Sequence, residues 1–145
     1  MPAGKPLRER ALSLLNRREH TRAELARKLT PHAEPEDDLN GLLDEFERRG
    51  WLSDERYARM RANARAGKHG NTRIAHELRE RGVAEDVIAS TLGELEQGEL
   101  ARARAVWATR FGSLPGDAKE RARQARFLQG RGFGWEVIRA VLRGG

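Results

Sequence analysis

Histidine and acidic side chains are the residues of this chain that could ligate a metal ion or transfer protons. The four histidines are scattered, and although His69 and His76 lie two helical turns apart, no third ligand is close to them in sequence. One group of acids could in principle bind a cation: Asp37, Asp38, Asp44 and Glu45. Acids near the start of a helix more often compensate the helix dipole. The chain has no cysteine, so it has neither a thiol nucleophile nor a cysteine-based zinc site. We therefore predict no metal site.

Glycine motifs that cradle phosphates in nucleotide-binding enzymes are absent, because the sequence has neither a Walker-type nor a dinucleotide-type glycine run. Residues Gly67–Gly70 (Gly-Lys-His-Gly) have the G-x-x-G form that grips phosphate in some single-strand binders. That use requires a strand beside a helix, and a flexible connection between helices is the alternative interpretation. The serines lack a neighbouring His and Asp by spacing. We predict no catalytic residues, no cofactor and no enzymatic activity.

Positive charge exceeds negative charge, with 28 Lys and Arg against 22 Asp and Glu and a formal net charge of +6, which favours polyanionic partners. The charge alternates in blocks: +5 over residues 1–30, −7 over 31–55, +6 over 56–82, −5 over 83–99 and +7 over 100–145. In the central block, Arg61, Arg65, Lys68 and Arg73 flank the Gly67–Gly70 turn. We expect these four cations to contact DNA phosphates or an acidic protein surface. The alternative is an ordinary solvated helix face.

Apolar residues recur with helical spacing along the chain, and no alternating strand pattern interrupts them. We expect nine helices, of which the second and eighth open with capping boxes at Thr21–Glu24 and Asp117–Glu120. Pro35 is expected in the first turn of the third helix, followed by acids that suit its N-terminus, and Gly50 should end that helix. No stretch approaches the ~18 apolar residues of a membrane span. Because Met1–Arg10 lacks an apolar signal region, we expect a cytoplasmic protein.

The sequence also repeats itself. An offset of 49 residues places five residues of the first segment on identical residues of the second: Ala26, Leu29, Glu36, Asp37 and Leu43 on Ala75, Leu78, Glu85, Asp86 and Leu92. An offset of 50 places Arg81 and Gly82 on Arg131 and Gly132. These matches predict an all-α fold of three tandem three-helix repeats, residues 1–50, 51–97 and 98–145, in an elongated, curved array. Three tryptophans lie near the repeat junctions, where packing is favoured over stacking on nucleobases: Trp51, Trp107 and Trp135.

Several runs of the sequence resemble the RecX family. Ala11–Leu25 (ALSLLNRREHTRAEL) resembles the opening of the family sequence, and Gly50–Ala58 (GWLSDERYA) resembles its junction between the first and second repeats. Gly70–Ile74 (GNTRI) with Leu78–Val83 (LRERGV) is similar to the core of the second repeat, and Phe127–Phe133 (FLQGRGF) is similar to the C-terminal signature. The resemblance extends over nearly the whole chain.

This resemblance implies a negative regulator of the bacterial recombinase RecA. Members lodge in the groove of the RecA–DNA filament and inhibit ATP hydrolysis, strand exchange and coprotease activity. They also bind single- and double-stranded DNA, and they act in DNA repair, recombination and the SOS response. The alternatives are a sequence-nonspecific DNA-binding helical module and a helical scaffold for another protein. We expect a monomer without a membrane contact. Eight cations are the candidate contacts with DNA or the filament: Arg61, Arg65, Lys68, Arg73, Arg79, Arg81, Arg121 and Arg123.

Overall fold

The structure, a computed structural model, describes residues 4–144, and within them it contains nine α-helices and no strand. The first repeat comprises α1 (Leu7–Arg17), α2 (Arg22–Leu29), a short 3₁₀ helix η1 (Thr30–His32) and α3 (Leu39–Arg48). The second comprises α4 (Asp54–Arg65), α5 (Asn71–Glu80) and α6 (Glu85–Gly93). The third comprises α7 (Glu99–Arg110), α8 (Ala118–Gly130) and α9 (Trp135–Arg143). The predicted all-α fold is confirmed.

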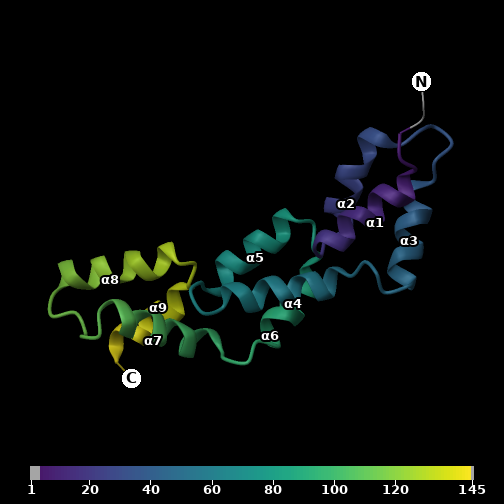
Figure 1. The fold of residues 1–145 in the computed structure, drawn as a ribbon. Helices are drawn as coiled ribbons and strands as arrows, with labels where there is room; N and C mark the ends of the chain where they lie inside the picture. Colours follow the sequence, from purple (N-terminus) through teal and green to yellow (C-terminus); the bar gives the residue numbers. More distant parts are fainter. Residues whose placement is uncertain (1–3, 145) are drawn as a thin grey trace.

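Each repeat has a hydrophobic core of its own. Leu25, Leu43 and Phe46 are buried in the first core, whereas Tyr57 and Leu78 are buried in the second. The third core is built around Leu128, Phe133 and Ile138. Figure 1 shows the three repeats following one another in an elongated, bent array with the two termini at opposite ends. Among the described residues, no helix is both long and apolar enough to cross a membrane.

The helix starts follow local capping chemistry, with two differences from the sequence prediction. The Thr21 hydroxyl accepts a hydrogen bond from the Glu24 amide, as a capping box requires, but the Glu24 carboxylate turns to Arg18 and Arg81 instead of completing the box. The prediction that Pro35 lies in the first turn of the third helix is wrong. That helix, α3, begins at Leu39, because the preceding Asp38 side chain caps it by accepting a hydrogen bond from the Gly41 amide.

Neighbouring repeats are joined by the same docking arrangement at both junctions. At the first, the α5–α6 turn lies against the start of α2, where the Thr21 hydroxyl donates to the Arg81 carbonyl over 2.5 Å. At the second, the α8–α9 turn lies against the start of α5, where the Gly70 amide donates to the Arg131 carbonyl over 2.8 Å. The approach is so close that a Cβ built on Gly82 would lie 2.4 Å from the Ala23 Cβ. Gly82 also has a φ of +85°, so both its backbone and its surroundings select glycine.

An acid from the following repeat completes each junction. The Asp54 carboxylate accepts a hydrogen bond from the Arg22 amide at the start of α2 over 2.8 Å, and Glu99 accepts one from the Asn71 amide at the start of α5 over 2.7 Å. Each acid is the first residue of the next repeat's first helix. It supplies the acceptor that an orphan amide at a helix N-terminus needs. The two junctions therefore set the spacing of the array and of every surface on it.

Candidate nucleic-acid and protein interface

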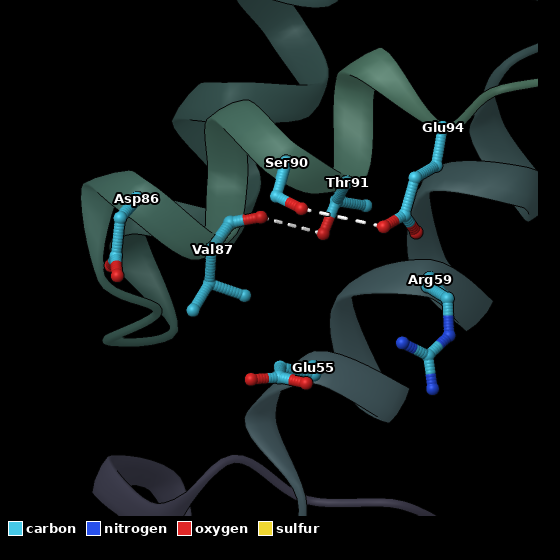
Figure 2. Close-up of a pocket in the computed structure, with 7 residues that line it drawn as sticks. All are labelled: Glu55, Arg59, Asp86, Val87, Ser90, Thr91 and Glu94. Atoms are coloured by element: carbon cyan, nitrogen blue, oxygen red, sulfur yellow. Dashed lines mark hydrogen bonds between the residues drawn. The ribbon is translucent and has the colours of Figure 1, made fainter.

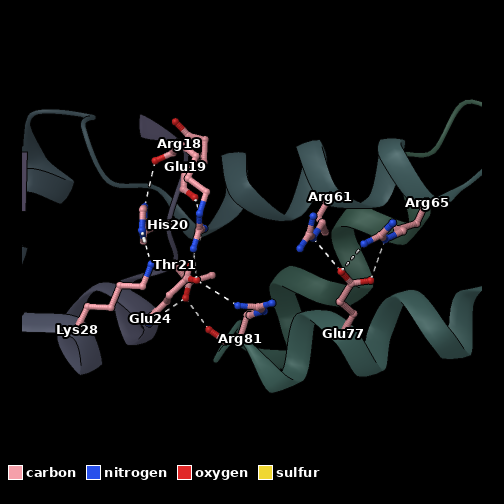
Figure 3. Close-up of polar contacts among 10 residues, drawn as sticks. All are labelled: Arg18, Glu19, His20, Thr21, Glu24, Lys28, Arg61, Arg65, Glu77 and Arg81. Atoms are coloured by element: carbon pink, nitrogen blue, oxygen red, sulfur yellow. Dashed lines mark hydrogen bonds and ion pairs between the residues drawn. The ribbon is translucent and has the colours of Figure 1, made fainter. Parts of the chain in front are cut away.

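Arg61 and Arg65 are candidate contacts from a part of the sequence with few acids, but the fold brings both side chains to Glu77. Their Nε atoms lie 2.8 and 3.1 Å from the Glu77 carboxylate, which reaches across from α5 to α4 (Figure 3). Burial raises the pKa of Glu77. The hydrogen bond from Arg65 and the charges of Arg61, Arg65 and Arg81 lower the pKa by more than burial raises it, so the net direction is downward. The partner comes from another helix, and its one carboxylate neutralises half of the charge of the two arginines.

Arg81 belongs to the first repeat junction. The Glu24 side chain, only 1% exposed, accepts two hydrogen bonds from Arg18, at 3.1 and 2.6 Å, and a third from Arg81 at 3.1 Å (Figure 3). Burial raises the pKa of this carboxyl, but the hydrogen bonds and charge of Arg18, with the charges of His20 and Lys28, lower it to about 2. Arg81 thus contributes to holding two repeats together.

Two other predicted cations are engaged at the surface, and a third is not. Arg79 forms an ion pair with Glu85 at the start of α6. Arg123 lies 2.7 Å from Glu120 within α8, and its guanidinium sits over the Phe111 ring, 5.2 Å from the centroid. Arg121 has no carboxylate partner among the described residues. Exposed pairs of this kind contribute little to stability.

The backbone of the Gly67–Gly70 turn cannot cradle a phosphate. The Lys68 and His69 amides donate to the Arg65 carbonyl, and the Gly70 amide donates to the Arg131 carbonyl, so these three donors are used within the fold. Arg73, in the first turn of α5, donates to the Gly130 carbonyl over 3.3 Å and lies against the docked turn. The turn connects α4 to α5 within the second repeat and packs against the third, and its exposed Lys68 side chain is its available cation.

A groove of about 430 Å³ opens beside this turn, and we call it the junction groove. Its walls include Lys68, Ala105, Val106, Arg110, Phe127 and Arg131, and no carboxylate lines it. The guanidinium carbons of Arg110 and Arg131 lie 5.4 and 5.1 Å from the centroid of the Phe127 ring. Sequence reasoning did not select Arg110 or Arg131, although Arg131 stands in the Arg-Gly pair that the 50-residue offset had marked.

A second basic hollow lies on the first repeat, and sequence reasoning missed it as well. This pocket of about 330 Å³ is lined by five groups that carry or can carry positive charge and by no carboxylate: Lys5, Arg10, Arg17, Lys28 and His32. They come from the start of the chain, α1, α2 and η1, which the fold brings together. The net charge of +5 over residues 1–30 was the available signal.

The middle repeat carries a surface of opposite sign. Figure 2 shows a pocket of about 190 Å³ between α4 and α6, with Glu55, Asp86 and Glu94 around its rim and Arg59 as the cation beside them. The side chains on its α6 wall are held within the helix, since the Ser90 hydroxyl donates to Glu94 over 3.3 Å. No group of three or more potential metal ligands occurs in the part of the chain that the structure describes.

Only one of the three tryptophans has the packing role that the sequence favoured. Trp107 does pack, and its indole nitrogen donates to Gln124 over 2.8 Å. Trp51 and Trp135, however, are 41% and 57% exposed. Trp51 rests on Phe46 with 5.5 Å between ring centroids, and Trp135 carries the Arg139 guanidinium 5.8 Å from its centroid. Exposed aromatic faces of this kind are available for contacts with a partner.

Three tandem three-helix domains with separate basic and acidic surfaces define an all-helical repeat protein. Models of three RecX domains match this chain in order: the first three-helix domain over residues 8–45, the second over 53–92 and the third over 97–142. The chain belongs to the RecX family, whose members are regulatory proteins.

Relatives named regulatory protein RecX match nearly the whole chain. The Chromobacterium violaceum protein is 51% identical over 142 residues, which cover 98% of this chain and 92% of the relative. The Ralstonia nicotianae protein is 44% identical over 138 residues, which cover 95% of this chain and 87% of the relative. The crystal structure of RecX from Lactobacillus salivarius superposes with a TM-score of 0.82 at 17% identity, covering 95% of this chain and 93% of that one, which shows the shared fold.

Proposed function

We propose that this protein is a negative regulator of RecA that binds in the groove of the RecA–DNA filament. Bound there, it inhibits ATP hydrolysis, strand exchange and coprotease activity. Membership of the RecX family supports this role. The elongated array of three repeats also supports it, since such an array presents a long surface to a helical partner. We expect the working form to be a cytoplasmic monomer.

The observation that carries the proposal is the division of charge over the surface. The junction groove and the hollow of the first repeat are basic and lack carboxylates, so they suit nucleic-acid phosphates or acidic protein surfaces. The pocket between α4 and α6 is acidic, and it would repel a DNA backbone at the same distance. A surface with both signs suits a nucleoprotein filament, in which protein and DNA are presented together.

The alternative, a sequence-nonspecific DNA-binding module, is favoured by the two basic surfaces taken alone. Titrating the protein into RecA that hydrolyses ATP on single-stranded DNA separates the two functions. A filament regulator inhibits hydrolysis at concentrations far below those that coat the free DNA. A DNA-binding module inhibits only when it occupies the DNA, and its effect then disappears with excess DNA.

The eight cations selected from the sequence remain proposed contacts. We rank their expected contributions to binding by whether each already has a carboxylate partner. Lys68, Arg73 and Arg121 have no carboxylate partner among the described residues. The other five do: Arg61, Arg65, Arg79, Arg81 and Arg123. A cation that is already paired gains less from a phosphate, because it must first give up or share its carboxylate. We therefore expect the Lys68 side of the central block to contribute more than the Glu77 side.

A further inference from the structure

The junction groove has the composition of a binding site for a small anionic group with a flat apolar part. Lys68 approaches from the second repeat, whereas Arg110 and Arg131 come from the third. Val106 and Phe127 supply apolar wall between these cations. The site therefore exists only when the second and third repeats are docked, and neither repeat alone contains it.

The cations of the groove are not neutralised by the protein. No carboxylate lies within ion-pair distance of Lys68, Arg110 or Arg131 among the described residues. The Arg131 guanidinium donates to the Lys68 carbonyl, over 3.5 Å. The positive charge around the groove also acts on the neighbouring His69. Burial lowers the pKa of His69, and the charges of Arg73, Arg131 and Arg65 lower it further.

The two guanidinium groups are also held in place before any ligand arrives. Both lie over the Phe127 ring, and Phe111 meets that ring edge-on with 5.4 Å between centroids. A guanidinium stacked on an aromatic ring keeps its own flat face for a second planar group and its N–H edge for an anion. Nucleobases stack on such guanidinium planes in single-strand complexes.

We propose that the junction groove binds one nucleotide of a single-stranded nucleic acid, with its phosphate at Lys68 and its base on the guanidinium plane of Arg110. The volume of about 430 Å³ suits one base that is turned out of the strand. A duplex offers this groove only phosphates, because its bases are paired and stacked. The apolar walls at Val106 and Phe127 would then gain nothing from binding.

The test is binding of a fluorescein-labelled oligothymidylate to the full chain without RecA, measured by anisotropy over a range of salt concentrations. The test variant is Lys68→Ala/Arg110→Ala. The matched control is Arg27→Ala/Arg48→Ala, which removes two exposed cations from the first repeat that have no carboxylate partner among the described residues. A third variant, Arg110→Lys, keeps the charge and removes the stacking plane. Although the site belongs to the proposed RecA regulator, this assay succeeds or fails independently of RecA inhibition.

The test variant should bind the oligonucleotide at least about tenfold more weakly than the control variant. Its plot of log affinity against log salt should flatten by about 0.7 for each lost phosphate contact. An abasic strand of the same length should bind the parent more weakly than oligothymidylate, and Arg110→Lys should remove that difference.

Equal binding by the test and control variants would overturn the proposal. Two other results would overturn it as well. One is an equal loss of duplex binding, which would make the groove a simple phosphate contact. The other is competition by thymidine monophosphate as effective as that by the strand, which would make the groove a site for free nucleotides.

Discussion

Substitution of Glu24 by glutamine tests whether the buried ion pair holds the first two repeats together. Glu24 lies at the start of α2 and receives hydrogen bonds from Arg18 of its own repeat and Arg81 of the next. Glutamine has nearly the same shape but no charge. The variant therefore keeps the packing of the junction and removes the attraction between the carboxylate and two guanidinium groups.

The structure sets the size of the expected loss. Lowering the pKa of Glu24 from 4.5 to about 2 corresponds to roughly 3 kcal/mol of preference for the ionised form in the folded state. The Arg18 side chain is 46% exposed and that of Arg81 is 36% exposed, so water screens both partners. After this discount we expect Glu24→Gln to lose about 1–2 kcal/mol of unfolding free energy.

Urea unfolding followed by circular dichroism measures this loss. With a slope of about 2 kcal/mol/M, the midpoint should fall by about 0.5–1 M. The matched control is Glu45→Gln, because Glu45 also has its pKa lowered to about 2, chiefly by the hydrogen bond from Arg8, but it lies at the surface within the first repeat. The control should shift the midpoint less, since solvent replaces the lost partner.

The pH dependence gives a second check with a defined sign. The Glu24 pKa is lower in the folded than in the unfolded chain, so its contribution is complete above pH 4.5 and is lost as the pH falls toward about 2. Parent and Glu24→Gln should therefore converge in stability over that window. If Glu24→Gln unfolds at the same urea concentration as the parent at pH 7, the carboxylate does not hold the junction and the reasoning is refuted.

His20 is buried with its Nε2 3.1 Å from the Lys28 ammonium, and burial lowers its pKa, so the chain should lose stability below pH ~6.5 and His20→Asn should reduce that loss in thermal melts. Gly132→Ala should cost more unfolding free energy than the roughly 1–2 kcal/mol expected for Gly50→Ala, because both glycines have positive φ but only at Gly132 would the added Cβ press against another repeat, at Arg73; equal urea midpoints would contradict this. Arg61→Ala/Arg65→Ala should inhibit RecA nearly as well as the parent, and a loss as large as that of Lys68→Ala/Arg110→Ala would show that the Glu77 pairing is opened in the filament.

Local chemistry explains what could be predicted along the chain. Helix period and capping depend on residues within a few positions of each other, so Thr21, Ser53 and Asp117 could be identified as caps from the sequence. The start of α3 was misplaced because Pro35 and the three consecutive acids after it all suit the first turn of a helix. Asp37 accepts a hydrogen bond from the Glu34 amide in the loop, and only Asp38 caps the helix. Local rules alone do not choose between neighbouring acids.

The pairing of charges could not be predicted in the same way. Sequence reasoning compares each arginine with acids three or four positions away, yet Arg81 meets Glu24 from 57 positions away and Arg65 meets Glu77 from the next helix. The junction groove likewise joins Lys68 to Arg131 across 63 positions. The Arg65–Glu77 distance is closed by packing of two helices within a repeat, whereas the two longer ones are closed only when one repeat docks on the next.

The three helical repeats, their order and the alternation of charge along the chain can be predicted from the sequence, because they depend on local periodicity and on composition. Which cations remain available to a partner depends on how the helices and repeats pack. Docking of the Gly82 and Gly132 turns brings acids of one helix or repeat to the arginines of another and leaves Lys68, Arg110 and Arg131 without a carboxylate in one groove. Coulombic pairing acts through space over a few ångströms, so it follows the fold and not the spacing along the chain.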